Sequence, residues 1–145
     1  MQPFVHLHVH SQYSVLDGQA SVKALVDKAI ANGMRGIALT DHGNMFGIKE
    51  LTDYVNKKNK DVDGEIKNLK KTIEELKSAD AVDQEALSKA ETALKEAESK
   101  IFTPIIGCEM YVADNDMTDR SNKKDIGRHL IVLAKNQHGY LSLIH

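Results

Sequence analysis

The sequence predicts an α/β fold in which short apolar strands alternate with amphipathic helices, and into which an antiparallel helical hairpin is inserted. Two observations favour this fold. An almost wholly apolar run at residues 36–40 follows a helical pattern, as is typical of a buried parallel strand. Residues 56–101 contain no aromatic side chain and show helical spacing of their apolar residues. The expected domains are therefore 1–55 joined to 102–145, and a separate hairpin at 56–101.

Composition limits what the chain is expected to be. With 145 residues, 41% of them hydrophobic, it suits one domain of ordinary size. The net charge of −2 argues against a strongly basic nucleic-acid surface, although bound metal ions would add positive charge that this count omits. The single cysteine, Cys108, excludes an internal disulfide and suits a reducing compartment. We find no signal peptide and no membrane span, and expect a cytoplasmic protein without a membrane partner.

The N-terminal third contains two expected strands with a helix between them. Residues 4–10 fit a first strand, and residues 11–20 a polar loop. Ser21 can cap a helix whose apolar stripe is Val22, Leu25, Val26, Ala29 and Ile30. Asn32 and Gly33 provide a stop signal. Residues 36–40 then form the second strand, which ends in the polar sequence Thr40-Asp41-His42-Gly43-Asn44.

The rest of the domain continues the same alternation. A second helix carries Ile48, Leu51 and Val55 on one face. A third strand is expected at residues 105–113, a fourth at 130–134, and a helix begins near Gly139. Strands separated by helices predict right-handed βαβ units and a parallel sheet or barrel. Because the chain ends as this helix begins, we expect a fragment of a longer domain.

The inserted segment is predicted to be a coiled-coil hairpin. Two runs of apolar residues follow a 3-4-3 spacing and are interrupted at residues 78–83: Ile66, Leu69, Ile73 and Leu76, then Leu87, Ala90, Leu94, Ala97 and, four residues on, Ile101. The hairpin is either an arm that contacts DNA or a partner, or a tolerated insertion with a solvated face. Its mixed charge offers no basic stripe for phosphates and favours the second interpretation.

The strongest chemical signal is the alternation of His6, His8 and His10 in the first expected strand. A period of two places all three imidazoles on one face, where they can converge on a metal ion. A solvated polar strand face is the alternative. A hydrolytic metal site is our leading hypothesis, since a row of three imidazoles is unusual on a solvent face.

Further candidate ligands come from other segments: Asp17, His42, Glu109 and His129. In parallel α/β folds, active sites gather at the carboxyl ends of strands, and His10, His42 and Glu109 fit that rule. His129 fits it less well, because it precedes its apolar run. Asp41 is either a ligand or a group that orients one through a hydrogen bond. Imidazole and carboxylate donors together suit Zn²⁺, Mn²⁺ or Fe better than Mg²⁺.

At these positions the sequence resembles the PHP (polymerase and histidinol phosphatase) domain. The motifs that carry the resemblance are His6-Leu7-His8-Val9-His10-Ser11, Val15-Leu16-Asp17-Gly18, Thr40-Asp41-His42-Gly43-Asn44-Met45-Phe46-Gly47, Pro104 to Val112, and His129 to Ala134. The Leu-Asp-Gly element and the sequence after Asp41-His42 resemble in particular the alpha subunits of bacterial replicative DNA polymerase III. The resemblance covers residues 3–55 and 102–145.

The resemblance implies a distorted seven-stranded (β/α) TIM-like barrel that holds up to three metal ions. By motif, the implied ligands are His8, His10, Asp17, His42, Glu109 and His129. The family's remaining ligands, a Cys or His and an Asp-x-His pair, have no counterpart here. The chain is thus expected to contain the first four strands of an incomplete barrel, to bind fewer ions, and to be marginally stable or to self-associate.

The resemblance also implies a function. In alpha subunits with intact ligands, the domain is linked to metal-dependent 3′→5′ exonuclease proofreading, with Glu109, His10 and His42 as the expected catalytic residues. The implied partners are a DNA 3′ end, the other polymerase domains and other replicase subunits. The alternatives are a non-catalytic scaffold module and a histidinol-phosphatase-like enzyme. All six testable ligand positions carry metal-competent residues, which favours the active form.

Overall fold

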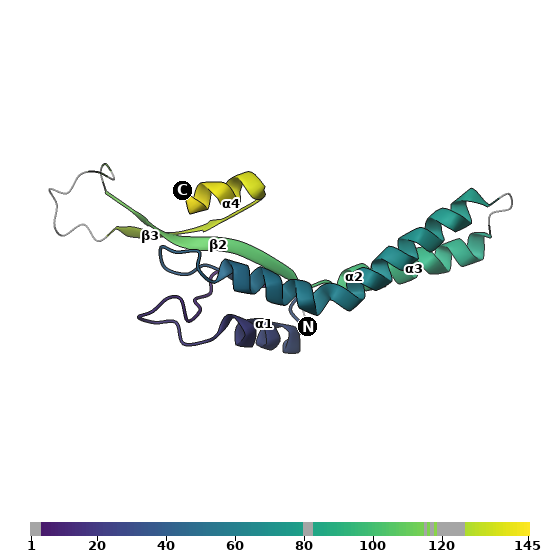
Figure 1. Cartoon of the computed structure of the whole chain (residues 1–145), viewed down its shortest axis with the longest axis horizontal. Helices are drawn as coiled ribbons and strands as arrows, with labels where there is room; N and C mark the ends of the chain where they lie inside the picture. Colours follow the sequence, from purple (N-terminus) through teal and green to yellow (C-terminus); the bar gives the residue numbers. More distant parts are fainter. Residues whose placement is uncertain (1–3, 80–82, 115, 117, 119–126) are drawn as a thin grey trace. The chain divides into compact units, whose positions relative to one another are not determined.

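The computed structural model describes residues 4–79, 83–114, 116, 118 and 127–145. The chain forms two compact units (Figure 1). The first consists of Met1–Tyr54 with Thr103–His145, and the second of Val55–Phe102. The second unit extends one residue beyond each end of the expected insertion, 56–101.

The first unit is built on a mixed three-stranded sheet in the order β1-β2-β3. Strand β1 (Gly36–Leu39) pairs in parallel with β2 (Thr103–Val112), starting at Gly36 opposite Thr103. Strand β3 (Arg128–Leu133) pairs with β2 in the antiparallel direction. The α/β class is confirmed, but the expectation of an all-parallel arrangement is wrong for β3. The register of β3 runs from Gly107 opposite Leu133 to Val112 opposite Arg128, and an antiparallel edge strand on an otherwise parallel sheet is common in α/β folds.

The segment at residues 4–10 is not the regular strand that its alternation predicts. The backbone bends at Leu7 and His8. It still follows β1, because Ala38 N donates to His6 O and Thr40 N donates to Val9 O, both at 2.9 Å. The N–H of Val9 donates instead to Thr40 Oγ1 at 2.9 Å, so a side-chain oxygen takes the place of a backbone carbonyl oxygen in the pairing. The described part of the chain therefore has three strands where the sequence predicted four.

Two short helices follow their sequence signals. Helix α1 (Val22–Ala31) starts at Ser21, whose side chain accepts a hydrogen bond from Ala24 N, and the chain turns at Gly33 with φ of 73°. Helix α4 (Gln137–Ile144) is capped by Asn136, whose side chain accepts from Gly139 N. Helix α1 packs on β1, and α4 lies beside β2 (Figure 1). The buried apolar residues of the first unit lie on α1, on β1, on β2 and at the start of α2: Val22, Val26, Ala29, Ile37, Ala38, Leu39, Cys108, Ile48 and Leu51.

The second unit is a helical hairpin. The expected second helix and the first hairpin arm form one continuous helix, α2 (Ile48–Ser78), and the second arm is α3 (Gln84–Lys100). Of the predicted seam residues, Ile73 and Ala97 are buried. Ion pairs between the described residues connect the antiparallel helices, among them Lys77–Glu91 at 2.9 Å, Lys70–Glu98 at 3.4 Å and Lys100–Glu65 at 3.8 Å. Of the predicted interruption at 78–83, residues 80–82 lie outside the described residues.

The Asn59 side chain closes the base of the hairpin: its amide nitrogen donates to Phe102 O at 2.8 Å, and its amide oxygen accepts from Phe102 N at 3.1 Å.

In the part of the chain that the structure describes, no helix has the length and apolarity that a membrane span requires.

Candidate metal centre

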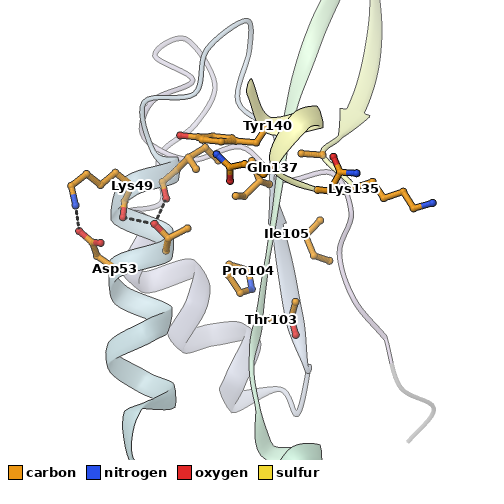
Figure 2. A pocket seen from close by; sticks show the side chains of 13 residues that line it. Lys49, Asp53, Thr103, Pro104, Ile105, Lys135, Gln137 and Tyr140 are labelled. Atoms are coloured by element: carbon orange, nitrogen blue, oxygen red, sulfur yellow. Dashed lines mark hydrogen bonds and ion pairs between the residues drawn. The ribbon is translucent and has the colours of Figure 1, made fainter. Parts of the chain in front are cut away.

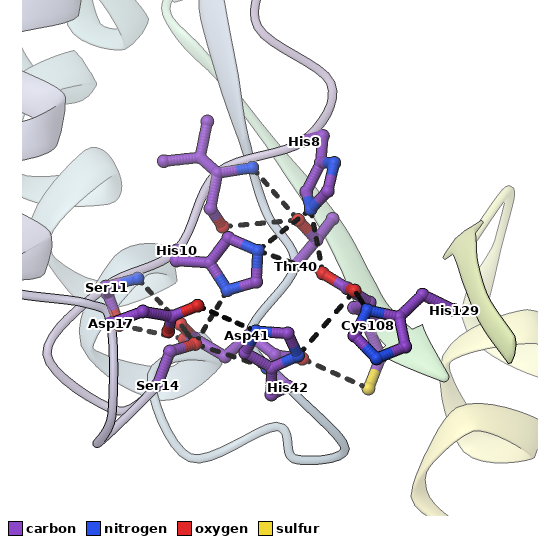
Figure 3. Close-up of polar contacts among 12 residues, drawn as sticks. His8, His10, Ser11, Ser14, Asp17, Thr40, Asp41, His42, Cys108 and His129 are labelled. Atoms are coloured by element: carbon purple, nitrogen blue, oxygen red, sulfur yellow. Dashed lines mark hydrogen bonds and ion pairs between the residues drawn. The ribbon is translucent and has the colours of Figure 1, made fainter. Parts of the chain in front are cut away.

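The predicted ligands come together just past the end of β1, beside the second half of β2. Figure 3 shows five of them, His8, His10, Asp17, His42 and His129, in this cluster. An isolated parallel bridge between His42 and Glu109 continues the β1–β2 pairing past the end of β1. It is fixed by Glu109 N donating to Asp41 O at 3.1 Å and Gly43 N donating to Glu109 O at 2.9 Å. The backbone therefore sets His42 beside Glu109, and the 4–10 segment brings in His8 and His10.

His129 reaches the same edge because β3 is antiparallel. Its register places His129 opposite Tyr111, near the carboxyl end of β2. His129 comes before the apolar residues of β3, and it therefore lies beside the carboxyl end of β2. From the sequence, His129 fitted the carboxyl-end rule poorly because its strand was expected to be parallel. The antiparallel direction of β3 removes that difficulty.

Glu109 is the centre of the cluster. Its side chain is 3% exposed, and its Oε2 lies 2.8 Å from His8 Nε2 and 2.9 Å from His10 Nε2. Its Oε1 faces the other two histidines, with His42 Nδ1 at 3.6 Å and His129 Nδ1 in contact. Burial raises the pKa of this carboxyl, but the hydrogen bond with His8 and the charges of the other three imidazoles outweigh burial, so the pKa lies below its ordinary value.

Asp17 joins the cluster from the loop at 11–20. Its Oδ2 lies 3.0 Å from His42 Nε2, although the Asp17 side chain is 54% exposed. That hydrogen bond is the main cause that holds the pKa of Asp17 below its ordinary value. His42 therefore has one ring nitrogen directed at Asp17 and the other at Glu109.

All six predicted ligand residues are brought together in three overlapping groups. Within each group the ligand atoms lie within 4.8 Å of one another: His8-His10-Glu109, His10-Asp17-His42 and His42-Glu109-His129.

The donor set fits a metal ion. His8 Nε2 and His10 Nε2 face each other at 2.8 Å beside the Glu109 carboxylate. Two imidazole lone pairs and a carboxylate oxygen in such proximity repel one another unless a proton or cation lies among them. These are also the ligand types that Zn²⁺ and related transition-metal ions take. The three-group cluster can therefore hold metal ions.

Asp41 belongs to none of these groups. It is 2% exposed and accepts three hydrogen bonds: from Ser11 N at 2.6 Å, Ser11 Oγ at 2.8 Å and Ser14 Oγ at 2.7 Å. Ser14 Oγ in turn lies 2.9 Å from His10 Nδ1. Of the two roles that the sequence left open, this geometry fits a group that orients a ligand.

Several polar residues around the cluster were not singled out from the sequence. Ser11 and Ser14 hold Asp41, Thr40 ties the 4–10 segment to β1, and Tyr111 Oη lies 3.2 Å from His42 Nδ1. Each of these residues lies within three positions of a predicted ligand, and this closeness in the sequence is the signal that could have identified them.

His6, by contrast, contacts the Phe4 ring, with centroids 4.8 Å apart. Cys108 is buried, which raises the pKa of its thiol.

A hollow in the first unit lies away from this cluster. It has a volume of about 660 Å³ and is formed by residues of α2, β2 and α4 and the turn before α4 (Figure 2). Ile105 and Pro104 form part of its apolar wall, and Lys49 pairs with Asp53 at 2.6 Å on its rim. None of the six predicted ligand residues lines it.

The α/β unit with its histidine–carboxylate cluster defines the chain as a protein with a candidate metal centre. The chain belongs to the PHP domain family, whose model matches residues 6–145. It is similar to DNA polymerase III subunit alpha of Treponema pallidum (40% identical over 144 residues), of Borreliella burgdorferi (36% over 146) and of Chlamydia trachomatis (31% over 142). Each match covers 97% of this chain, which spans 8–9% of the length of these relatives.

Proposed function

We propose that this chain is the PHP part of a replicative DNA polymerase alpha subunit, and that its cluster is a metal-dependent phosphoesterase site that removes nucleotides from DNA 3′ ends. The observation that carries the proposal is the position of Glu109, whose two carboxylate oxygens face two pairs of histidines. The similarity to DNA polymerase III alpha subunits supports DNA as the substrate class.

In this proposal the six clustered residues hold the ions, which are Zn²⁺ or Mn²⁺ with Fe as a further candidate, up to three in a complete domain. Bound ions would supply Lewis acidity that activates water and offsets the charge of a phosphoryl group. The two oxygens of Glu109 face different pairs of histidines, so this carboxylate would be a ligand in both groups that contain it. The rings of His10 and His42, 4.3 Å apart, border the place where the three groups meet. These three residues are the proposed catalytic set.

The wider setting is also proposed from the similarity. The partners would be the DNA 3′ end, the remaining polymerase domains and other replicase subunits, in the cytoplasm. A scaffold module without catalysis is the alternative that the test below must separate. A histidinol-phosphatase-like activity receives less support, because the relatives named above are polymerase subunits.

The test uses the full-length polypeptide that contains this chain. We would measure bound metal after dialysis, and the metal-dependent shortening of a DNA primer labelled at its 5′ end. The wild-type protein is expected to hold metal and to shorten the primer. The double variant His8→Ala/His10→Ala should do neither, whereas His138→Ala, which alters an exposed histidine outside the cluster, should match the wild type.

Two results would contradict the proposal. Bound metal without primer shortening would indicate structural ions in a scaffold, and primer shortening that persists in the double variant would place the activity elsewhere. Thermal unfolding of all three proteins checks that the substitutions leave the fold intact.

A further inference from the structure

His10 belongs to two of the donor groups, one with His8 and Glu109 and one with Asp17 and His42. A neutral imidazole carries a hydrogen on one nitrogen and a lone pair on the other. It can therefore serve only one of the two groups at a time. The hydrogen bond made by the nitrogen that does not bind metal decides which of the two ring nitrogens offers its lone pair.

The hydrogen bonds of Ser14 determine which nitrogen of His10 carries the hydrogen. Ser14 Oγ lies 2.7 Å from Asp41 Oδ1, 3.2 Å from His42 N and 2.9 Å from His10 Nδ1. A carboxylate only accepts, so the single hydroxyl hydrogen of Ser14 goes to Asp41. The backbone N–H of His42 only donates, so it takes one Ser14 lone pair. Ser14 has no second hydrogen to give, and His10 Nδ1 must therefore donate to it.

The other nitrogen of His10 then carries the lone pair. His10 Nε2 lies 2.8 Å from His8 Nε2 and 2.9 Å from Glu109 Oε2. Its lone pair is thus available to the group that contains His8 and Glu109.

The hydrogen bonds that hold Ser14 are protected from water. Ser14 and Asp41 are each 2% exposed, and Ser11, which donates twice to Asp41, is fully buried. Because water cannot replace these partners and hydrogen bonds are stronger in a buried site, the orientation of the Ser14 hydroxyl is fixed. A fixed hydroxyl fixes the tautomer of His10 in turn.

We propose that Ser14, held by Asp41, is a positioning residue that fixes His10 in the Nδ1–H tautomer and assigns it to the metal ion of the His8–Glu109 group. The second half of this statement rests on the proposed metal-dependent function. The Asp17 group is left with His42 as its imidazole ligand. Ser14 itself touches no metal ion and acts only through His10.

The first experiment compares two serine-to-alanine variants of the full-length polypeptide. Ser14→Ala removes the contact with His10, whereas Ser11→Ala removes a hydroxyl from the same carboxylate without touching His10. Affinity for Zn²⁺ alone is measured by competition with a chelator. Loss of a group that orients a ligand costs roughly 10–100-fold in metal affinity, and we expect this for Ser14→Ala only. Equal losses in both variants, or none in Ser14→Ala, would overturn the proposal.

The second experiment reads the tautomer directly and needs neither metal nor activity. Solid-state NMR of metal-free protein labelled with ¹⁵N-histidine distinguishes a protonated Nδ1 from a protonated Nε2, and a His10→Gln variant identifies the His10 signals. We expect protonated Nδ1 in the wild type and a mixture in Ser14→Ala. Protonated Nε2 in the wild type would overturn the proposal even if Ser14→Ala fails to fold. A wild type that shows the expected tautomer but binds no Zn²⁺ would contradict the proposed function and the metal assignment, and leave the tautomer standing.

Discussion

The Tyr111 hydroxyl lies 3.2 Å from Nδ1 of His42, and the two rings are stacked at an interplanar angle of 20° with centroids 6.1 Å apart. The same tyrosine meets the edge of His129, 4.9 Å away. Tyr111 therefore restrains two of the clustered histidines from the carboxyl end of β2. Its hydroxyl engages the His42 nitrogen opposite the one that faces Asp17.

Tyr111→Phe is expected to weaken metal binding while leaving the fold intact. The variant keeps the stacked ring but removes the partner of His42 Nδ1, so affinity for Zn²⁺ should fall about 10-fold, as for other groups that orient ligands. Thermal stability should change little, because Tyr111 is 51% exposed. The matched control is Tyr54→Phe, which also loses a hydroxyl contact, with Asp27 at 2.8 Å, away from the cluster. An equal loss of affinity in both variants would contradict the role of Tyr111.

Glu109→Gln is expected to lower the metal content more than Asp17→Asn does. Glu109 occurs in two of the donor groups and Asp17 in one, and an amide is a poorer metal ligand than a carboxylate. Metal analysis after dialysis of the full-length protein measures the difference. Glu96→Gln, an exposed change on α3, serves as the control and should retain the wild-type content. Equal metal content in the Glu109 and Asp17 variants would argue against a shared carboxylate.

The stability of the metal-free protein should fall in acid partly through Glu109. Its pKa in the folded state lies below the ordinary value of 4.5. The ionised carboxylate therefore contributes stability above that ordinary value, and the contribution is lost as the pH falls through the lowered folded value. Urea unfolding of wild type and Glu109→Gln across this range should show a stability difference that shrinks with acidity. A difference that grows toward low pH would refute the assignment.

Two glycine-to-alanine changes should have opposite effects. A Cβ at Gly18 would collide with the carbonyl oxygen of Ser11, so Gly18→Ala should shift the loop that carries Asp17, at a cost of roughly 1–3 kcal/mol. Gly64 lies within α2 with nothing within 4 Å of an added Cβ. Gly64→Ala should therefore stabilise the helix by about 0.5–1 kcal/mol. Urea denaturation and Zn²⁺ affinity test both, and a Gly18→Ala protein with wild-type values would contradict this view of the loop.

Shortening the hairpin is expected to leave the metal cluster unaffected. All six clustered residues lie in the first unit, so replacing residues 61–99 by a short glycine linker removes none of them. The shortened protein retains Asn59 and Phe102, whose hydrogen bonds close the hairpin base. Zn²⁺ affinity of the full-length protein should be unchanged. Its DNA affinity separates the two interpretations of the hairpin: a tolerated insertion leaves it unchanged, and a DNA-contacting arm lowers it.

Local signals in the sequence were sufficient for the helices. Ser21 and Gly33 delimit α1 as predicted, because capping and a left-handed turn depend on residues a few positions apart. The seam of the hairpin likewise follows from apolar spacing within each arm. The set of six clustered residues was recognisable too, since each lies in a short motif with its own residue pattern.

Only the tertiary structure decided how those motifs meet. The direction of β3, which brings His129 to Glu109, depends on the path of the chain between strands and leaves no periodic trace in the sequence. The bend at Leu7 and His8 is accompanied by a hydrogen bond from Val9 N to the side chain of Thr40, thirty-one residues further along, where a regular strand would have a backbone partner. The link from Asp41 through Ser14 to His10 is of the same kind. Sequence pattern by itself determined which residues are chemically competent, whereas contacts between distant segments determined which nitrogen and oxygen atoms face one another.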